Sequence, residues 1–66
     1  MWYVYFLQLS NGDIYVGSTN DLKRRFASHQ AGQVLSTRVH LPVQLKSYNE
    51  FLVLADAIKT VLEIAP

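Results

Sequence analysis

Two runs of aromatic and branched residues begin the sequence, WYVYFLQL at residues 2–9 and IYVGST at residues 14–19. Aromatic and β-branched residues favour β-strands. The intervening Ser-Asn-Gly at residues 10–12 is typical of a tight turn, because asparagine and glycine tolerate the backbone conformations that such turns require. This stretch predicts a β-hairpin, and the other elements are placed relative to it.

The length of the turn sets which residues face each other across the hairpin. A two-residue loop would put Tyr5 and Tyr15 on opposite faces. A three-residue loop, with Gly12 in the left-handed conformation, pairs Leu9 with Asp13 instead. We predict the three-residue loop, which makes the two tyrosines diagonal neighbours roughly 7 Å apart on one face.

This register divides the hairpin side chains between two faces. One face is apolar and is expected to form the core, with Trp2, Val4, Phe6, Ile14 and Val16. The other face carries the hydroxyl groups of Tyr3, Tyr5 and Tyr15. Because side chains alternate along a strand, the two sets are expected to stay separate.

A helix is predicted directly after the hairpin. Asn20 and Asp21 are residue types that cap or begin helices, and Gly32 suits a helix end. These signals predict a helix over residues 20–31. Residues 31–41 show no hydrophobic period and precede a proline, so they predict a loop.

The second half of the chain supplies a third strand over residues 43–51 and an amphipathic helix over residues 52–64. Alternation in the strand would divide it between one face with Val43, Leu45, Ser47 and Asn49 and another with Gln44, Lys46, Tyr48 and Glu50. The sequence thus predicts an α+β fold in one domain over residues 1–66. Its small three-stranded antiparallel sheet is flanked by helices, in the order β-β-α-β-α.

Composition excludes several classes of protein. The 66 residues include no cysteine, which excludes a disulfide framework, a cysteine-ligated zinc site and a thiol nucleophile. Half of the residues are apolar and 17% are charged, a balance that is typical of a globular domain. No segment reaches the roughly 18 apolar residues that span a bilayer. We therefore expect a cytoplasmic protein without a membrane partner.

The positive charges are concentrated in the middle of the sequence. Residues 22–49 hold five of the six lysines and arginines and no acidic residue, although the formal net charge is only +1. A basic segment on a nearly neutral chain indicates a polyanionic partner. A solvated charged surface without a partner is the alternative that these charges leave open.

The hairpin and the first helix combine residue types that suit phosphodiester chemistry. Tyr5 and Tyr15 share one face of the hairpin, and Arg25 and His29 lie one turn apart on the helix. An arginine stabilises charge on phosphoryl oxygens, and a phenol or imidazole moves a proton to or from an attacking water. Backbone N–H groups at residues 18–20 favour anions. The same helix would equally serve as a solvated amphipathic element.

The spacing of these motifs is specific. Tyr3-Val4-Tyr5 is followed, ten residues after Tyr5, by YVGSTNDLKRRF at residues 15–26 and then by His29. Further matching positions are Thr37-Arg38, Pro42-Val43 and YNEF at residues 48–51. Together they resemble the GIY-YIG nuclease family, most of all its small single-domain bacterial members. Tyr3 stands where the family often has glycine.

The resemblance implies metal-dependent hydrolysis of DNA phosphodiester bonds, with DNA as the partner and Mg²⁺ or Mn²⁺ as the cofactor. By position it implies catalytic roles for Tyr5, Tyr15, Arg25 and His29. Contacts to the DNA are expected from Gly17, Ser18, Asn20, Lys23, Arg24 and Arg38.

The metal ligand is where the sequence departs from the family. Members hold the ion through a glutamate four residues beyond an alanine that aligns with Ala57, and here that position is Val61. Glu63 is the nearest acidic candidate, but two residues along a helix correspond to a rotation of roughly 200°. Glu50, at the end of the third strand, is a weaker substitute. Glu63 is the metal ligand that we predict.

Three functions remain open from the sequence. The first is an active endonuclease, and the second is a catalytically inactive DNA-binding module with the same fold. The third is a structural dimer formed through the apolar final helix. The uninterrupted apolar run at residues 51–54 predicts weak self-association, that is, a weak homodimer.

Overall fold

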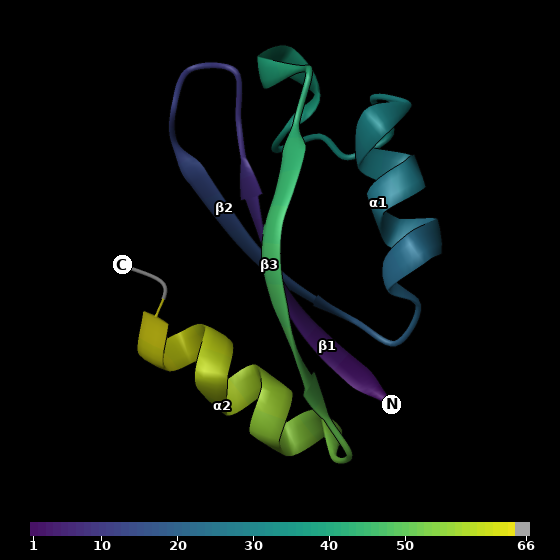
Figure 1. Cartoon of the computed structure of the whole chain (residues 1–66), viewed down its shortest axis with the longest axis vertical. Coiled ribbons are helices and arrows are strands. Elements are labelled where there is room, and N and C mark those ends of the chain that lie inside the picture. Colours follow the sequence, from purple (N-terminus) through teal and green to yellow (C-terminus); the bar gives the residue numbers. More distant parts are fainter. Residues whose placement is uncertain (65–66) are drawn as a thin grey trace.

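The computed structural model describes residues 1–64, and Figure 1 shows the arrangement of its three strands and two α-helices. They are β1 (Trp2–Gln8), β2 (Ile14–Thr19), α1 (Leu22–Gln30), β3 (Gln44–Phe51) and α2 (Leu54–Ile64). The α+β class and the order β-β-α-β-α are confirmed. A short 3₁₀ helix, η1 (Arg38–His40), lies in the segment predicted as a loop. Residues 65–66 of the predicted domain lie outside the described range.

The hairpin between β1 and β2 has the predicted three-residue turn. The Leu9 amide donates a hydrogen bond to the Asp13 carbonyl at 2.8 Å, and Gly12 has a φ of +90°. In the resulting register Tyr5 is paired with Gly17. Residues with a side chain adopt such a positive φ rarely, so Gly12 fixes the loop length and with it the register.

β1 is the central strand of an antiparallel sheet with the order β2-β1-β3. Its pairing with β3 changes register at one point, because Phe6 faces Ser47 whereas Leu7 faces Leu45. Lys46 is therefore an extra residue in β3, which is a β-bulge. A bulge reverses the alternation of side chains along the strand that carries it.

The strict alternation predicted for residues 43–51 is wrong for this reason. Tyr48 faces Tyr5 and Leu45 faces Leu7, so Tyr48 and Leu45 lie on the same face of the sheet, although strict alternation would put residues 45 and 48 on opposite faces. The sequence around Lys46 carries no glycine or proline that would indicate the bulge.

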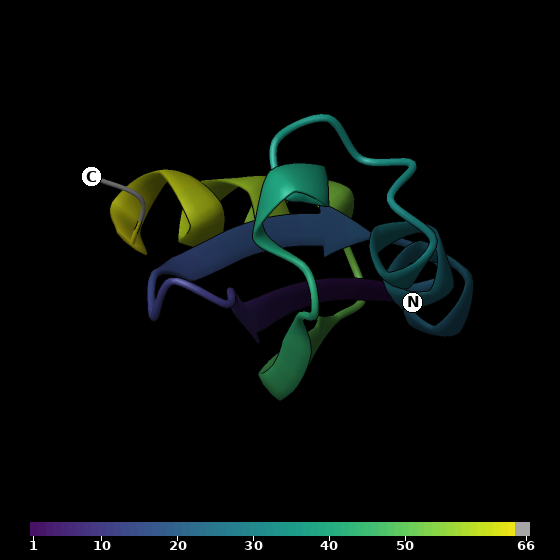
Figure 2. The ribbon, with the colours of Figure 1, turned by 90° about the horizontal axis from the view of Figure 1, so that it is seen from above.

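The two helices cover opposite faces of the sheet, as the two perpendicular views show (Figures 1 and 2). α1 covers the tyrosine face, where a core cluster is formed by Tyr5, Leu7 and Val43. Leu22 and Phe26 of α1 pack against this cluster. The expectation that the opposite face alone forms the core is therefore wrong, because the tyrosine rings are themselves packed beneath a helix.

α2 covers the other face, parts of which stay exposed. Val4 on β1 and Ala57 on α2 are both fully buried. Ile14, which was expected in the core, is 54% exposed, and Leu52 and Leu62 around α2 are 85% and 74% exposed. Within residues 1–64, neither helix is long and apolar enough to cross a membrane.

α1 begins two residues later than predicted because Asp21 acts as its N-cap. The Asp21 carboxylate accepts a hydrogen bond from the Arg24 amide at 3.1 Å. Such a bond satisfies one of the free N–H groups of the first helical turn, and it requires the capping residue to lie outside the helix. At the other end the chain turns away at Gly32, which has a φ of +74°.

Candidate active site

A buried hydrogen bond joins β1 to α1. The Tyr5 hydroxyl lies 2.9 Å from Nε2 of His29, and the two side chains are 1% and 0% exposed. Tyr5 comes from the central strand, and His29 from the end of the helix that covers it. The structure thus brings together two of the four residues to which the sequence assigns catalytic roles.

The second nitrogen of His29 is bound by a residue that the sequence did not single out. Nδ1 lies 2.9 Å from Oγ1 of Thr37, which is also fully buried. Thr37 reaches His29 from the segment between α1 and β3, which has no period from which a side-chain direction can be inferred. The one available signal was its place in the Thr37-Arg38 pair that matches the family.

Arg25 lies one turn before His29 and is held by the same tyrosine. Its Nε donates a hydrogen bond to the Tyr5 hydroxyl at 3.3 Å, and the side chain is half-buried. A guanidinium has five N–H donors, so one bond from Nε leaves the terminal N–H groups to bind an anion in the forked geometry that suits phosphate oxygens. The hydrogen bond with Tyr5 raises the pKa of Arg25, which is therefore charged.

Tyr15 completes the group of aromatic rings. Its ring centroid lies 6.2 Å from that of Tyr5 and 5.1 Å from that of His29, in the latter case edge to face. The two tyrosines are neighbours on one face, as the predicted register requires. Tyr15 is half-buried, whereas Tyr5 is enclosed, so Tyr15 is the more accessible of the two phenols.

Gly17 faces Tyr5 across the hairpin and leaves room for its ring. A Cβ atom at this position would lie 2.5 Å from the Tyr5 hydroxyl oxygen and 2.6 Å from Cζ. These distances are shorter than any real Cβ contact. Because Gly17 has no Cβ atom, the Tyr5 side chain can occupy this space.

Burial determines the protonation of the central pair. Burial raises the pKa of the Tyr5 hydroxyl, although the hydrogen bond from Arg25 opposes this change. Burial and the charge of Arg25 lower the pKa of His29. Both groups are therefore neutral at pH 7. Since Arg25 already donates to Tyr5, we assign the His29 proton to Nδ1, so that Nε2 accepts the phenolic proton and Thr37 accepts from Nδ1.

The start of α1 forms a polar hollow next to Arg25, which we call the cationic pocket. It has a volume of about 580 Å³ and is lined by Thr19, Asn20, Asp21, Arg24, Arg25 and Ser28. Two arginines outnumber its one acidic residue. Together with the N-terminus of a helix, these charges make the pocket suitable for a phosphate group.

The other predicted substrate contacts lie outside this pocket. Ser18 is paired with Val4, which places its side chain on the α2 face of the sheet. Lys23 is exposed beside a separate groove, and Arg38 is exposed on η1. Of the six residues expected to bind DNA, Asn20 and Arg24 are the two that line the cationic pocket.

The residues present do not fit the metal site that the family implies. Val61, at the expected glutamate position, is half-buried, and the predicted ligand Glu63 is exposed on α2, across the sheet from Arg25. Among residues 1–64 there is no group of three or more histidines or acidic residues that could hold a metal ion. Mg²⁺ sites are usually anchored by one or two carboxylates. Among residues 1–64, the acidic residue that lines a pocket with Arg25 is Asp21, whose carboxylate is engaged in capping α1.

Comparison with known proteins identifies the class that this fold and site represent. The GIY-YIG catalytic domain matches residues 1–59. UPF0213 proteins of Cupriavidus pinatubonensis and Cupriavidus necator are 40% and 36% identical to the chain, over 92% and 96% of its length and 69% and 70% of theirs. The solution NMR structure of a UPF0213 protein from Bacillus halodurans matches with a TM-score of 0.61 and 32% identity, covering 97% of this chain and 70% of that one.

The chain therefore belongs to the GIY-YIG family, within its UPF0213 group of small bacterial proteins. This confirms the resemblance found in the sequence. The fold implies a nucleic acid as the class of substrate.

Proposed function

We propose that the chain is a DNA endonuclease that cleaves phosphodiester bonds at the mouth of the cationic pocket. The observation that carries this proposal is the position of Arg25. Its Nε is fixed by Tyr5, while the rest of its guanidinium adjoins a pocket with a second arginine and a helix N-terminus. A guanidinium so fixed is oriented before substrate arrives, which is what stabilisation of a transition-state charge requires.

Each residue of the group has a separate part in the proposed reaction. Arg25 binds the non-bridging oxygens of the scissile phosphate and stabilises the charge that develops on them. Tyr15, the accessible phenol, orients the attacking water and accepts its hydrogen bond. Tyr5 and His29 are enclosed and do not reach substrate; they hold Arg25 and the ring of Tyr15 in place.

In the family, Mg²⁺ or Mn²⁺ supplies additional charge stabilisation at the phosphate. We assign no step to such an ion, because Val61 leaves its usual protein anchor absent and Glu63 is exposed on the other side of the sheet.

The test is a nicking assay on supercoiled plasmid, with Mg²⁺ and separately with Mn²⁺. Wild type is expected to convert plasmid to the open circle, and Arg25→Ala and Tyr15→Phe to lose at least 100-fold in rate, in the range found when single groups that stabilise charge or transfer a proton are removed. Lys59→Ala on α2 is the matched control, because it removes one positive charge away from the pocket. Equal rates for Arg25→Ala and Lys59→Ala would contradict the proposal.

Val61 favours a second candidate function, a DNA-binding module without turnover. This function needs the cationic pocket but no metal ligand. It predicts that wild type binds DNA with an affinity that falls steeply with salt, because phosphate contacts release counterions, while plasmid stays intact with either metal. Binding that is independent of salt would count against both functions.

A further inference from the structure

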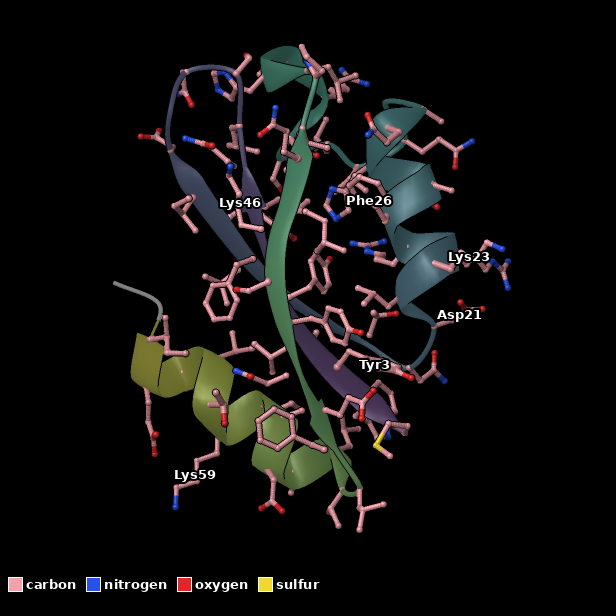
Figure 3. All side chains as sticks on the ribbon, in the orientation of Figure 1. Tyr3, Asp21, Lys23, Phe26, Lys46 and Lys59 are labelled. Carbon is pink, nitrogen blue, oxygen red and sulfur yellow. The ribbon has the colours of Figure 1, made fainter. Side chains whose placement is uncertain are left out.

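A second hollow, the aromatic groove, lies beside the cationic pocket and has no part in the proposed hydrolysis. It has a volume of about 490 Å³ and lies between α1 and the strands β1 and β3. Tyr3 and Tyr48 line it from the sheet, and Phe26 lines it from the helix. Figure 3 shows Tyr3 and Phe26 directed into the space between sheet and helix, whereas Lys23 points outward from α1.

The aromatic groove offers flat apolar surfaces that face the solvent. The rings of Tyr3 and Tyr48 meet edge to face, with centroids 5.9 Å apart and an interplanar angle of 68°. Tyr48 is 49% exposed, which is high for an aromatic residue in a strand and leaves ring surface free to pack against another group. The β-bulge at Lys46 is what brings Tyr48 to this face.

Charges around the aromatic groove disfavour a phosphate there. Asp21 and Glu50 lie on its lining with Lys23 as the one cationic residue. Carboxylates would repel a phosphate but accept hydrogen bonds from the amino groups of nucleobases. A neutral aromatic ring system that carries N–H donors therefore suits the groove better than an anion.

The two hollows are contiguous, because Asn20 and Asp21 line both. One side is polar and cationic, with Arg24 and Arg25, and the other is aromatic and slightly acidic. A nucleotide has the same two parts, a phosphate and a neutral aromatic base, joined by a sugar.

We infer that the aromatic groove binds an unpaired base of a nucleic acid strand whose phosphate occupies the cationic pocket. This inference rests on the proposed function in that the same strand occupies both hollows. A base within a duplex has both faces stacked and its edge paired, so it cannot fill the groove. The site therefore selects single-stranded or locally opened nucleic acid at the nucleotide next to the bound phosphate.

The test compares a fluorescein-labelled single-stranded DNA oligonucleotide with an abasic oligonucleotide of the same length, by fluorescence anisotropy at low salt. The abasic strand keeps every phosphate but lacks bases. Stacking of one base on an aromatic side chain predicts that wild type binds the intact strand roughly 5- to 150-fold more tightly. Tyr48→Ala is expected to bring this ratio close to one, and Tyr48→Phe to preserve it.

Arg25→Ala separates this inference from the proposed function. It should weaken binding of both strands by the same factor and leave their ratio unchanged. Equal affinity of wild type for the two strands, or a ratio that Tyr48→Ala does not alter, overturns the inference even where binding still depends on Arg25. Circular dichroism of each variant checks that the fold is retained, as expected for an exposed residue such as Tyr48.

A second measurement tests the aromatic groove without any phosphate. Addition of the uncharged nucleoside deoxyadenosine should shift the ring proton signals of Tyr3 and Tyr48 in an NMR titration, because a stacked purine changes the local ring current. The signals of Trp2, which lies on the other face of the sheet, should stay in place. Unmoved Tyr3 and Tyr48 signals overturn the inference, whatever the plasmid assay gives.

Discussion

Gly17 and Tyr5 face each other across the hairpin so closely that a methyl group on Gly17 would lie 2.5 Å from the Tyr5 hydroxyl oxygen. Since that hydroxyl also binds Arg25 and His29, a displaced ring would break both interactions. Gly17 therefore maintains the geometry of the site, although it contributes no functional group to it.

The substitution Gly17→Ala is expected to lower the free energy of unfolding by roughly 1–3 kcal/mol, the usual cost of overpacking, and to weaken DNA binding. Urea denaturation and anisotropy measure the two effects. Gly12→Ala is the control. Its positive φ makes alanine cost about 1–2 kcal/mol, but a Cβ there meets no atom within 4 Å, so DNA binding should persist. Equal DNA binding by the two variants would show that Gly17 does not maintain the geometry of the site.

Thr37→Val is expected to destabilise the chain by about 1–3 kcal/mol, because Nδ1 of His29 would be left buried without a partner. Thr37→Ser keeps the hydroxyl and should therefore lose less stability than Thr37→Val. Nitrogen-15 NMR of the imidazole provides the specific measurement, since wild type should give the signals of the Nδ1-protonated tautomer. If Thr37→Val keeps both that tautomer and the wild-type stability, the hydrogen bond contributes nothing.

Stability should fall in acid because of His29. Its pKa in the folded chain is lowered by burial and by Arg25, so the unfolded chain binds a proton more readily. The contribution of neutral His29 to the free energy of unfolding is thus fully present above the pKa of about 6.5 that histidine has in the unfolded chain. It is lost as the pH falls through the lower pKa of the folded chain. Urea denaturation from pH 8 to pH 5 measures it, and His29→Gln should flatten this part of the curve.

Tyr5 makes stability depend on pH in the opposite direction, so that stability falls as the pH rises into the alkaline range. Its raised pKa means that the folded chain disfavours the phenolate. Its contribution is present below the unfolded pKa of about 10 and is lost as the pH rises through the higher folded value. Tyr5→Phe should remove this alkaline loss, as followed by circular dichroism, and an unchanged alkaline transition would show that Tyr5 does not titrate there.

Val61→Glu should create the missing carboxylate. The expected result is plasmid nicking that requires Mg²⁺ or Mn²⁺ and exceeds that of wild type by 10-fold or more, with a rise in melting temperature when Mn²⁺ is added. Val61→Gln is the matched control, because it has the same shape without the charge. If Val61→Glu neither binds Mn²⁺ nor gains activity, the identity of residue 61 does not limit catalysis.

The apolar surface around α2 predicts weak self-association. Leu52 and Leu62 are 85% and 74% exposed. Burial of such side chains against a second copy of the chain is favourable by roughly 25 cal/mol of free energy per Å² of apolar surface. Sedimentation equilibrium should show a mass that rises with concentration, and Leu62→Lys should reduce the rise. A monomeric mass at the highest concentrations would rule out the homodimer.

Local residue chemistry was sufficient to predict the hairpin and much of the site. Gly12 and the turn length fixed the register, and the register placed Tyr5 next to Tyr15. The helical spacing of Arg25 and His29 then predicted one group of side chains, which the structure brings together. These predictions succeeded because each depends on neighbours within one element or one short turn.

Other features depend on contacts between distant segments and were missed. The bulge at Lys46 arises from the match between β1 and β3, and it carries no marker in its own sequence. Thr37 lies in a segment without a period, so its approach to His29 was not visible. The core was assigned to one face alone, although both faces contribute to it, because a tyrosine counts as polar until the covering helix is known.

The tyrosine face is at once hydrophobic core and candidate active site, and this changes how sequence variation in such domains should be interpreted. Tyr5 and His29 are among the largest fully buried side chains, so a lineage that lost cleavage would still need them in order to fold. Arg25 and Tyr15 are only half-buried, so folding depends on them less. In homologous sequences, substitutions of Arg25 and Tyr15 would therefore be the first sign that cleavage has been lost.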